Sequence, residues 1–112
     1  MTRPEVLMLL GDIEEAAVAI LNDARDRSLD DYLDTRSLRS SIEREFIIIG
    51  EALKNALDIE PALPITQGRR IVNFRNLLVH QYSIVDDEYV WGLIQRDLPR
   101  LLAEVRALLP PS

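Results

Sequence analysis

The sequence predicts an all-helical protein, an antiparallel bundle of four to five helices. Apolar residues recur three and four positions apart along most of the chain, and no segment alternates apolar and polar residues as a half-buried strand would. The composition, 47% hydrophobic but only 5% aromatic, also favours helix over sheet. At 112 residues the chain can bury one core, so we expect a single domain over residues 1–112.

The first helix is expected from Pro4 to Arg27. Proline is well tolerated in the first turn of a helix, where its missing N–H has no partner to lose. The residues expected on the buried face of this helix are Val6, Leu9, Leu10, Ile13, Ala16, Ala17, Ile20, Leu21 and Ala24. The polar run that follows, from Ser28 to Asp34, is rich in aspartate and is predicted to be a loop.

The second helix is expected from Thr35 to Leu57, with Asp34 or Thr35 as its N-cap. Its expected buried residues are Leu38, Ile42, Phe46, Ile49, Leu53 and Ala56. The run Phe46–Ile49 widens this stripe, and a helix that is apolar most of the way round needs partners on two sides. The sequence leaves open whether the second partner is a helix of the same chain or a second subunit.

The third helix is predicted from Thr66 to Tyr82, after a loop marked by Pro61 and Pro64. The residues expected to face inward are Ile71, Phe74, Leu77 and Leu78. After a short connection, the fourth helix is predicted to begin at Asp86–Glu88, because carboxylates are favoured at a helix N-terminus.

The apolar stripe of the fourth helix continues almost to the end of the chain. Its members are Tyr89, Val90, Leu93, Ile94, Leu98, Leu101, Leu102, Val105 and Leu108. Pro99 lies inside this stripe and must kink or break the helix, because proline removes a backbone donor and clashes with the preceding turn. Pro110 and Pro111 end it.

The charge of the chain is negative overall but unevenly distributed. The formal net charge is −6, which argues against nucleic-acid binding, because proteins that bind phosphates usually carry a basic surface. Residues 61–85, however, contain Arg69, Arg70 and Arg75 and no acid, and they include the only histidine, His80. Three arginines are a modest patch that a solvent-exposed helix face would also explain.

The residue types that the sequence lacks disfavour several classes of protein. With no cysteine and one histidine, disulfides and thiolate zinc sites are excluded, and we expect neither a metal nor a cofactor. No stretch approaches the roughly 20 apolar residues of a membrane span, and residues 1–5 do not open a secretory signal. We therefore expect a cytoplasmic protein without a membrane segment.

The most informative segment runs from Arg75 to Tyr82 and reads RNLLVHQY. Histidine can take and give a proton near neutral pH, and arginine holds a planar charge that suits phosphate, so the pair is suited to metal-free phosphodiester cleavage. In a regular helix, Asn76 and His80 share a face, whereas Arg75 and His80 point about 140° apart. They can converge if the arginine leans across, if the helix ends near His80, or if a second copy contributes across a two-fold axis.

This segment resembles the signature of HEPN-domain proteins, an arginine with a polar residue directly after it and a histidine four to six residues further on. A tyrosine two positions after the histidine is similar to the form found in the HepT-type toxins of HEPN/MNT toxin–antitoxin pairs. Further similarity occurs at Ile49–Ala52, Ile71–Phe74, Val85–Asp86 and Leu98–Pro99, so the resemblance covers nearly the whole chain.

The resemblance implies a homodimeric HEPN-type bundle in which two motifs line one cleft and cleave RNA as a metal-independent endoribonuclease. By position, Arg75 and His80 match the catalytic pair, and Asn76 matches the polar residue beside the arginine. Tyr82 matches the residue that the partner, an MNT-type nucleotidyltransferase antitoxin, modifies with AMP to silence the toxin. Arg69 and Arg70, in the same basic island, are expected to contact RNA.

Two other functions remain open from the sequence. A HEPN-like bundle would also serve as a non-catalytic nucleotide-binding module or as an accessory subunit of a nucleotidyltransferase, with Arg75 and His80 holding phosphate without turnover. The acidity of the chain favours this reading mildly. A purely structural interaction domain would explain the apolar second helix but leaves the clustering of Arg75, His80 and Tyr82 to chance. A lone histidine near a helix end is by default a cap or a surface group.

Overall fold

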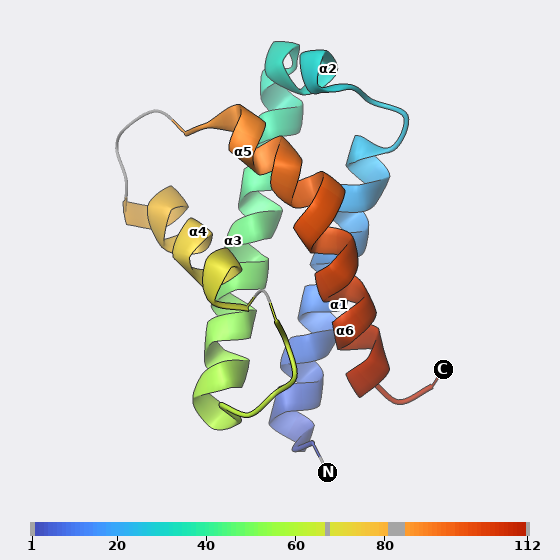
Figure 1. Cartoon of the computed structure of the whole chain (residues 1–112), viewed down its shortest axis with the longest axis vertical. Coiled ribbons are helices and arrows are strands. Elements are labelled where there is room, and N and C mark those ends of the chain that lie inside the picture. Colours follow the sequence, from blue (N-terminus) through green and yellow to red (C-terminus); the bar gives the residue numbers. More distant parts are fainter. Residues whose placement is uncertain (1, 67, 81–84, 112) are drawn as a thin grey trace.

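The computed structural model describes residues 2–66, 68–80 and 85–111, and within these ranges the regular structure is entirely helical. Two long helices, α1 (Pro4–Ala24) and α3 (Arg36–Ile59), run side by side along the molecule (Figure 1). The shorter elements are α2 (Leu29–Asp34), α4 (Gly68–His80), α5 (Asp87–Gly92), the π-helical segment η1 (Leu93–Asp97) and α6 (Leu98–Leu108). The predicted all-helical fold is confirmed. No helix in the described ranges is long and apolar enough to span a membrane.

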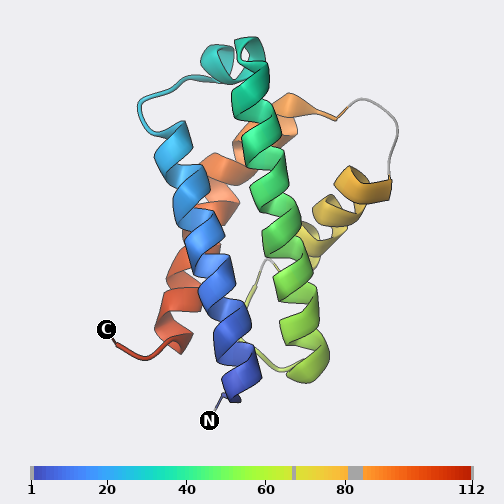
Figure 2. The ribbon, with the colours of Figure 1, turned by 180° about the vertical axis from the view of Figure 1, so that it is seen from behind.

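The helix α3 lies between α1 and α4, as the views from the two sides of the molecule show (Figures 1 and 2). Its residues Phe46, Ile49 and Leu53 have no exposed area. The rod formed by α5, η1 and α6 crosses the α1–α3 pair and packs mainly on α1. Among the described residues, the wide apolar face of α3 is therefore covered by helices of the same chain, although Ile48 remains 40% exposed.

Aromatic contacts hold α4 to the rest of the bundle. The ring of Phe74 meets that of Phe46 edge-on, with centroids 5.4 Å apart, and Tyr89 of α5 lies 5.7 Å from Phe74. Such pairs contribute about 0.5–1.5 kcal/mol each beyond the area they bury. Ile71, one turn before Phe74, is fully buried. These contacts fix which side of α4 faces the bundle and hence which side faces solvent.

The predicted third helix corresponds to α4, with two differences. It begins at Gly68 rather than at Thr66. The prediction that Leu77 faces inward is wrong, because its side chain is 52% exposed. The buried arc of α4 includes Ile71, and Leu77 lies about 120° away from it around the helix. Tyr82, and Ser83 and Ile84 of the predicted connection after it, lie outside the described residues.

The aspartate-rich segment after α1 is the helix α2 rather than the predicted loop. Ser28 and Asp31 form a capping box, in which the Ser28 hydroxyl accepts from the Asp31 N–H (3.1 Å) and the Asp31 carboxylate accepts from the Ser28 N–H (2.9 Å). Asp30 adds a second acid to the first turn, where the helix dipole favours negative charge. The aspartates that suggested a loop therefore stabilise a helix start. The preceding helix ends at Ala24, before the predicted Arg27.

The predicted interruption at Pro99 takes the form of a π-helical segment. Pro99 occupies the first turn of α6, where a missing N–H costs little, and the N–H just before it, that of Leu98, donates to the Leu93 carbonyl. The wider turn also carries Asp97, a buried carboxylate only 8% exposed. Its Oδ2 lies 3.4 Å from Nη1 of Arg70, which ties η1 to α4.

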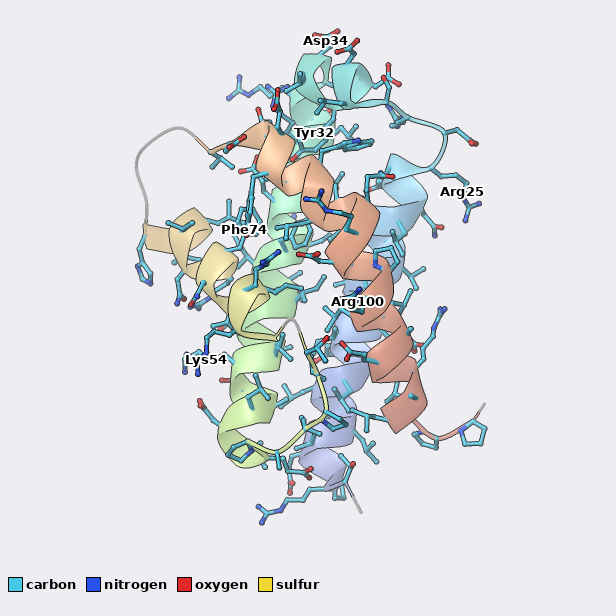
Figure 3. The ribbon with its side chains drawn as sticks, in the orientation of Figure 1. Arg25, Tyr32, Asp34, Lys54, Phe74 and Arg100 are labelled. Atoms are coloured by element: carbon cyan, nitrogen blue, oxygen red, sulfur yellow. The ribbon has the colours of Figure 1, made fainter. Side chains whose placement is uncertain are left out.

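Charged groups meet at the end of the bundle where α2, α3 and α5 join. Arg39 donates to the backbone carbonyls of Tyr32 and Leu33 and lies 3.9 Å from the Asp87 carboxylate. Burial, together with the negative charge of Asp87, raises the pKa of Glu43, and Arg39 offsets this in part. Tyr32, labelled in Figure 3, has a buried hydroxyl without a hydrogen-bond partner among the described residues, and burial raises its pKa. Burial and the nearby Asp87 thus make the ionised form of Glu43 unfavourable in the folded protein.

Replacing Glu43 with glutamine is expected to stabilise the fold near neutral pH but not below about pH 4. The pKa of Glu43 is higher in the folded than in the unfolded chain. Protonation of Glu43 therefore stabilises the folded state. This contribution to the free energy of unfolding is fully present below the unfolded pKa of about 4.3 and is lost as pH rises through the folded value. Urea denaturation at the two pH values measures the difference. Glu15→Gln, on the exposed side of α1, controls for removing one negative charge, and equal gains in both variants would contradict the prediction.

Candidate functional site

Arg75 lies where α4 crosses α3 at very short range. The α3 residue beneath it is Gly50, and a Cβ atom built there would lie 2.2 Å from Cβ and 2.7 Å from Cγ of Arg75. Atoms in packed interiors do not approach so closely, so a larger residue at position 50 would have to displace α4. The Arg75 side chain is only 18% exposed as it passes over the glycine. The crossing of two helices, rather than α4 alone, positions this arginine.

The guanidinium of Arg75 makes few polar contacts within the described part of the chain. Its Nη1 donates to Oδ1 of Asn76 at 2.9 Å, and its Nη2 lies 4.0 Å from Oε2 of Glu51. Its Nε is buried, and no described residue accepts a hydrogen bond from it. An ion pair as long as that with Glu51, whose side chain is 59% exposed, contributes about 0–1 kcal/mol. Much of the positive charge of Arg75 therefore remains available to an anionic ligand.

An exposed polar stripe runs along the solvent side of α4. Its members are Arg69, Asn73, Asn76 and His80. Their spacing of i, i+4, i+7 and i+11 places them within an arc of about 60° on a regular helix. Arg75 points away from this stripe, as expected for a residue five positions before His80. Its hydrogen bond to Asn76 nevertheless draws the guanidinium back towards the His80 face, although no hydrogen bond joins Arg75 to His80 within the described residues.

The two other arginines of the basic island have different surroundings. Arg69 is exposed and lines a hollow between α3 and α4. Arg70 lies 3.4 Å from Asp97, so part of its charge is offset by a buried carboxylate. The island contains no acid in the sequence, but the fold brings Asp97 and Glu51 to it from other helices.

Comparison with known proteins identifies the family. Residues 13–108 match the family model described as "Ribonuclease HepT-like". The chain belongs to this HepT-like ribonuclease family. A Methanocaldococcus jannaschii protein named "Putative RNase MJ1380" is 27% identical over 106 residues, which are 94% of this chain and 97% of that protein. A Thermococcus cleftensis protein named "Probable ribonuclease HepT" is 31% identical over 100 residues, 88% and 91% of the two chains. No solved structure matches the chain significantly.

The family match confirms the HepT-type HEPN domain to which the motif pointed, and the matched region includes all of α4. Among the residues singled out in the sequence, the structure joins Arg75 to Asn76 and aligns Asn76 with His80. Tyr82 lies outside the described residues. Within the described ranges there is no group of three or more His, Asp or Glu side chains close enough to hold a metal ion.

Three polar residues near the HepT-type motif did not stand out in the sequence. Lys54, Asp58 and Asn73 line the same hollow as Arg69. Helical spacing contained the signal, because Lys54 and Asp58 are four apart on α3 and Asn73 stands four after Arg69 on α4. What the sequence could not show is that these two helices cross so that the residues face one another.

Gly50→Ala is expected to destabilise the fold by about 1–3 kcal/mol, as overpacking does in a tight contact, and to lower activity by displacing Arg75. Gly11→Ala is the matched control, because no atom of another side chain or helix lies within 4 Å of a Cβ built at Gly11. Replacing a mid-helix glycine in open space should stabilise by about 0.5–1 kcal/mol. Urea denaturation of both variants measures the two effects. A gain in stability at both positions would show that the α3–α4 crossing tolerates a side chain.

Proposed function

We propose that this chain is the endoribonuclease toxin of a HEPN/MNT toxin–antitoxin pair and that it cleaves RNA without a metal in a cleft shared by two protomers. The observation that carries the proposal is Arg75, held over Gly50 and hydrogen-bonded to Asn76 on the edge of the exposed His80 face. Membership of the HepT-like family and the ribonuclease names of the relatives support the activity at a coarser level.

The chemistry uses a nucleophile that RNA itself supplies. The 2′-hydroxyl attacks the neighbouring phosphorus, and the bond to the 5′-oxygen breaks, leaving a 2′,3′-cyclic phosphate and a 5′-hydroxyl. His80 takes the proton from the 2′-hydroxyl or gives one to the leaving oxygen, a contribution of roughly 10²–10⁴ in rate. Arg75 stabilises the negative charge that develops on the phosphoryl oxygens, and Asn76 orients its guanidinium. Arg69 and Arg70 contact the RNA, Arg69 more strongly because Asp97 offsets the charge of Arg70.

The divergence of Arg75 and His80 on one helix favours a site built from two protomers. Leu77 lies beside the His80 face and is 52% exposed, so a second copy of the chain would cover an apolar side chain there. A two-fold axis beside the Asn76 edge of this face would bring the guanidinium of Arg75, which Asn76 holds, towards the His80 of the other protomer.

In this proposal an MNT-type nucleotidyltransferase silences the toxin by attaching AMP to Tyr82. The modified residue stands two positions after His80 in the sequence. The added phosphate carries negative charge, so it would compete with RNA for Arg75, and the adenosine would add bulk near the same site. Inhibition would then be both electrostatic and steric.

The main alternative is a domain that binds nucleotide without cleaving RNA. The net charge of −6 favours it, as do the carboxylates of Glu51 and Asp97 beside two of the arginines. Purified protein of this kind would bind nucleotide and leave RNA intact.

His80→Ala is expected to slow RNA cleavage by roughly 10²–10⁴-fold and to relieve growth arrest on expression, because it removes the proton-transfer group. Arg75→Ala should also lose most activity. Cleavage of a labelled RNA in the presence of EDTA measures both effects, with circular dichroism to show that helicity is unchanged. Arg100→Ala, which removes an exposed arginine from α6 (Figure 3), is the matched control and should cleave at the parental rate. A folded His80→Ala variant that stays equally toxic would refute the mechanism.

Mixing the two inactive variants tests whether the site is shared. If Arg75 and His80 act across the two-fold axis, a heterodimer of Arg75→Ala and His80→Ala protomers contains one intact pair. Random exchange of subunits should then restore about a quarter of the parental activity. Activity that stays at the level of the separate variants would place the two residues of each site in the same protomer.

Co-expression with an MNT-type nucleotidyltransferase is expected to increase the intact mass of the chain by one or more adenylate groups. Tyr82→Phe should remain unmodified and active. Tyr89→Phe is the matched control, because Tyr89 is 41% exposed on α5 and its loss should leave modification unchanged. An unmodified mass in an inactive complex would show that the antitoxin inhibits by binding alone.

A further inference from the structure

A small hollow lies between α3 and α4, next to the candidate site. Its volume is about 160 Å³. It is lined by Lys54, Leu57 and Asp58 of α3 and by Arg69, Val72 and Asn73 of α4. A cavity of roughly 150 Å³ holds one benzene ring, so the hollow has the size of a single planar ring. Figure 3 shows Lys54 projecting outward from α3.

The apolar and polar groups of the hollow suit a nucleobase. Leu57 and Val72 offer apolar walls to the faces of a ring. At the edge of the ring, the Asn73 amide can donate and accept hydrogen bonds, whereas the ionised Asp58 carboxylate can only accept. Unstacked bases of single-stranded RNA are read by hydrogen bonds to their edges in this way.

The cations at the hollow suit the phosphates on either side of such a base. Lys54 and Arg69 come from different helices and both are exposed, so each can reach the RNA backbone. Lys54 also lies 3.2 Å from Asp58, an exposed pair one helical turn apart that contributes little to stability. RNA can therefore replace this ion pair with a phosphate at Lys54 and a base donor at Asp58.

The hollow lies close to Arg75 along both helices. On α3, Lys54 follows Glu51, the neighbour of Arg75, by about one turn. On α4, Asn73 and Arg69 precede Arg75 by two and six residues. At 1.5 Å per residue this corresponds to roughly 3–9 Å along the helix axis, which is comparable with the spacing of neighbouring nucleotides.

We infer that the α3–α4 hollow is a nucleobase subsite that holds the base next to the scissile phosphate and selects bases with an exocyclic amino group. The inference rests on the proposed ribonuclease function and adds a specificity determinant to it. Adenine, cytosine and guanine each donate an amino hydrogen to Asp58, whereas uracil places a carbonyl oxygen, which the carboxylate repels, at the position where cytosine has its amino group.

A second hollow, between α1 and α3, shows why charge matters. It is larger, about 270 Å³, and is lined by Leu9, Asp12, Ile48, Glu51, Ala52 and Asn55. The charged residues that line it are two acids, Asp12 and Glu51, and none is a cation, so the lining is unfavourable for a phosphate backbone. Both hollows are lined in part by α3, but the net charge of the lining side chains is positive in the first and negative in the second. Asp12 is therefore a natural control for Asp58.

The test measures binding in the inactive His80→Ala protein, so that it does not depend on cleavage. Fluorescence anisotropy compares short single-stranded oligomers of cytidine and of uridine, and we expect the cytidine oligomer to bind roughly tenfold more tightly. In Asp58→Asn the preference should fall towards one, because an amide can donate to the uracil carbonyl. Asp12→Asn makes the same change in charge in the other hollow and should keep the preference.

The outcomes separate the subsite from the catalytic proposal. Equal affinities for the two oligomers, or a preference that Asp58→Asn and Asp12→Asn leave equally intact, would overturn the subsite. Failure of the parent protein to cleave RNA would overturn the ribonuclease mechanism without altering the binding result.

Lys54 provides an independent chemical readout, because it is the only lysine of the chain. A cytidine oligomer with a periodate-oxidised 3′ end forms an imine with a nearby amine, and borohydride traps it. Peptide mapping should locate the adduct on Lys54, and excess unmodified cytidine oligomer should suppress it. Lys54→Arg keeps the charge and should abolish the adduct. Labelling confined to the N-terminal amine would place the RNA elsewhere.

Discussion

Because Gly50 has no Cβ atom, α4 can cross α3 with the Arg75 side chain in direct contact with the α3 backbone. The crossing sets the depth at which the arginine is buried and leaves Asn76 and Glu51 as its polar neighbours. It also sets how closely α3 and α4 approach each other beside the hollow that they line. The candidate catalytic arginine and the hollow beside it therefore depend on the same missing side chain.

The close crossing explains how an acidic protein can offer a site for an anion. The acids of the chain outnumber its basic residues, 19 to 13, so the chain as a whole repels RNA at long range. Where charges are partly withdrawn from water, however, the local arrangement matters more than the total. Arg75 is mostly buried, and Glu51, the carboxylate that lies 4.0 Å from its guanidinium, is exposed, so Glu51 offsets only part of the charge of Arg75. Arg70, by contrast, is matched by the buried Asp97 and mainly joins α4 to η1.

Local patterns in the sequence were sufficient for much of this structure. Helical periodicity located the long helices, and the five-residue spacing from Arg75 to His80 correctly indicated that the two diverge on one helix. The aspartates around Ser28 led to the wrong prediction of a loop, because the same residues favour both loops and helix N-termini. Only the reciprocal Ser28–Asp31 hydrogen bonds decide between the two. The prediction for Leu77 was wrong because an apolar residue at the edge of a helical stripe can face either the core or the solvent.

Other features depend on contacts between residues far apart in sequence, which periodicity does not report. The pairing of Arg70 with Asp97 spans 27 positions and requires the π-helical segment before Pro99 to present the carboxylate. The hollow between α3 and α4 likewise requires a particular crossing. Gly50 alone does not predict that crossing, because Gly11 also lies inside a helix and has open space around it.

The arrangement of side chains around α4 also bears on how one short helix can serve both a second protomer and an RNA strand. On a regular helix, Leu77 lies about 60° to one side of His80, and Val72, in the wall of the hollow, lies about 80° to the other side. A dimer contact centred on Leu77 would therefore leave the hollow open. His80 stands between the two surfaces, where a group from the second protomer and a phosphate bound along the groove can both reach it. His80 is exposed, whereas many catalytic groups lie in a buried pocket. An exposed position is what we expect of a site that a partner protomer and a substrate complete.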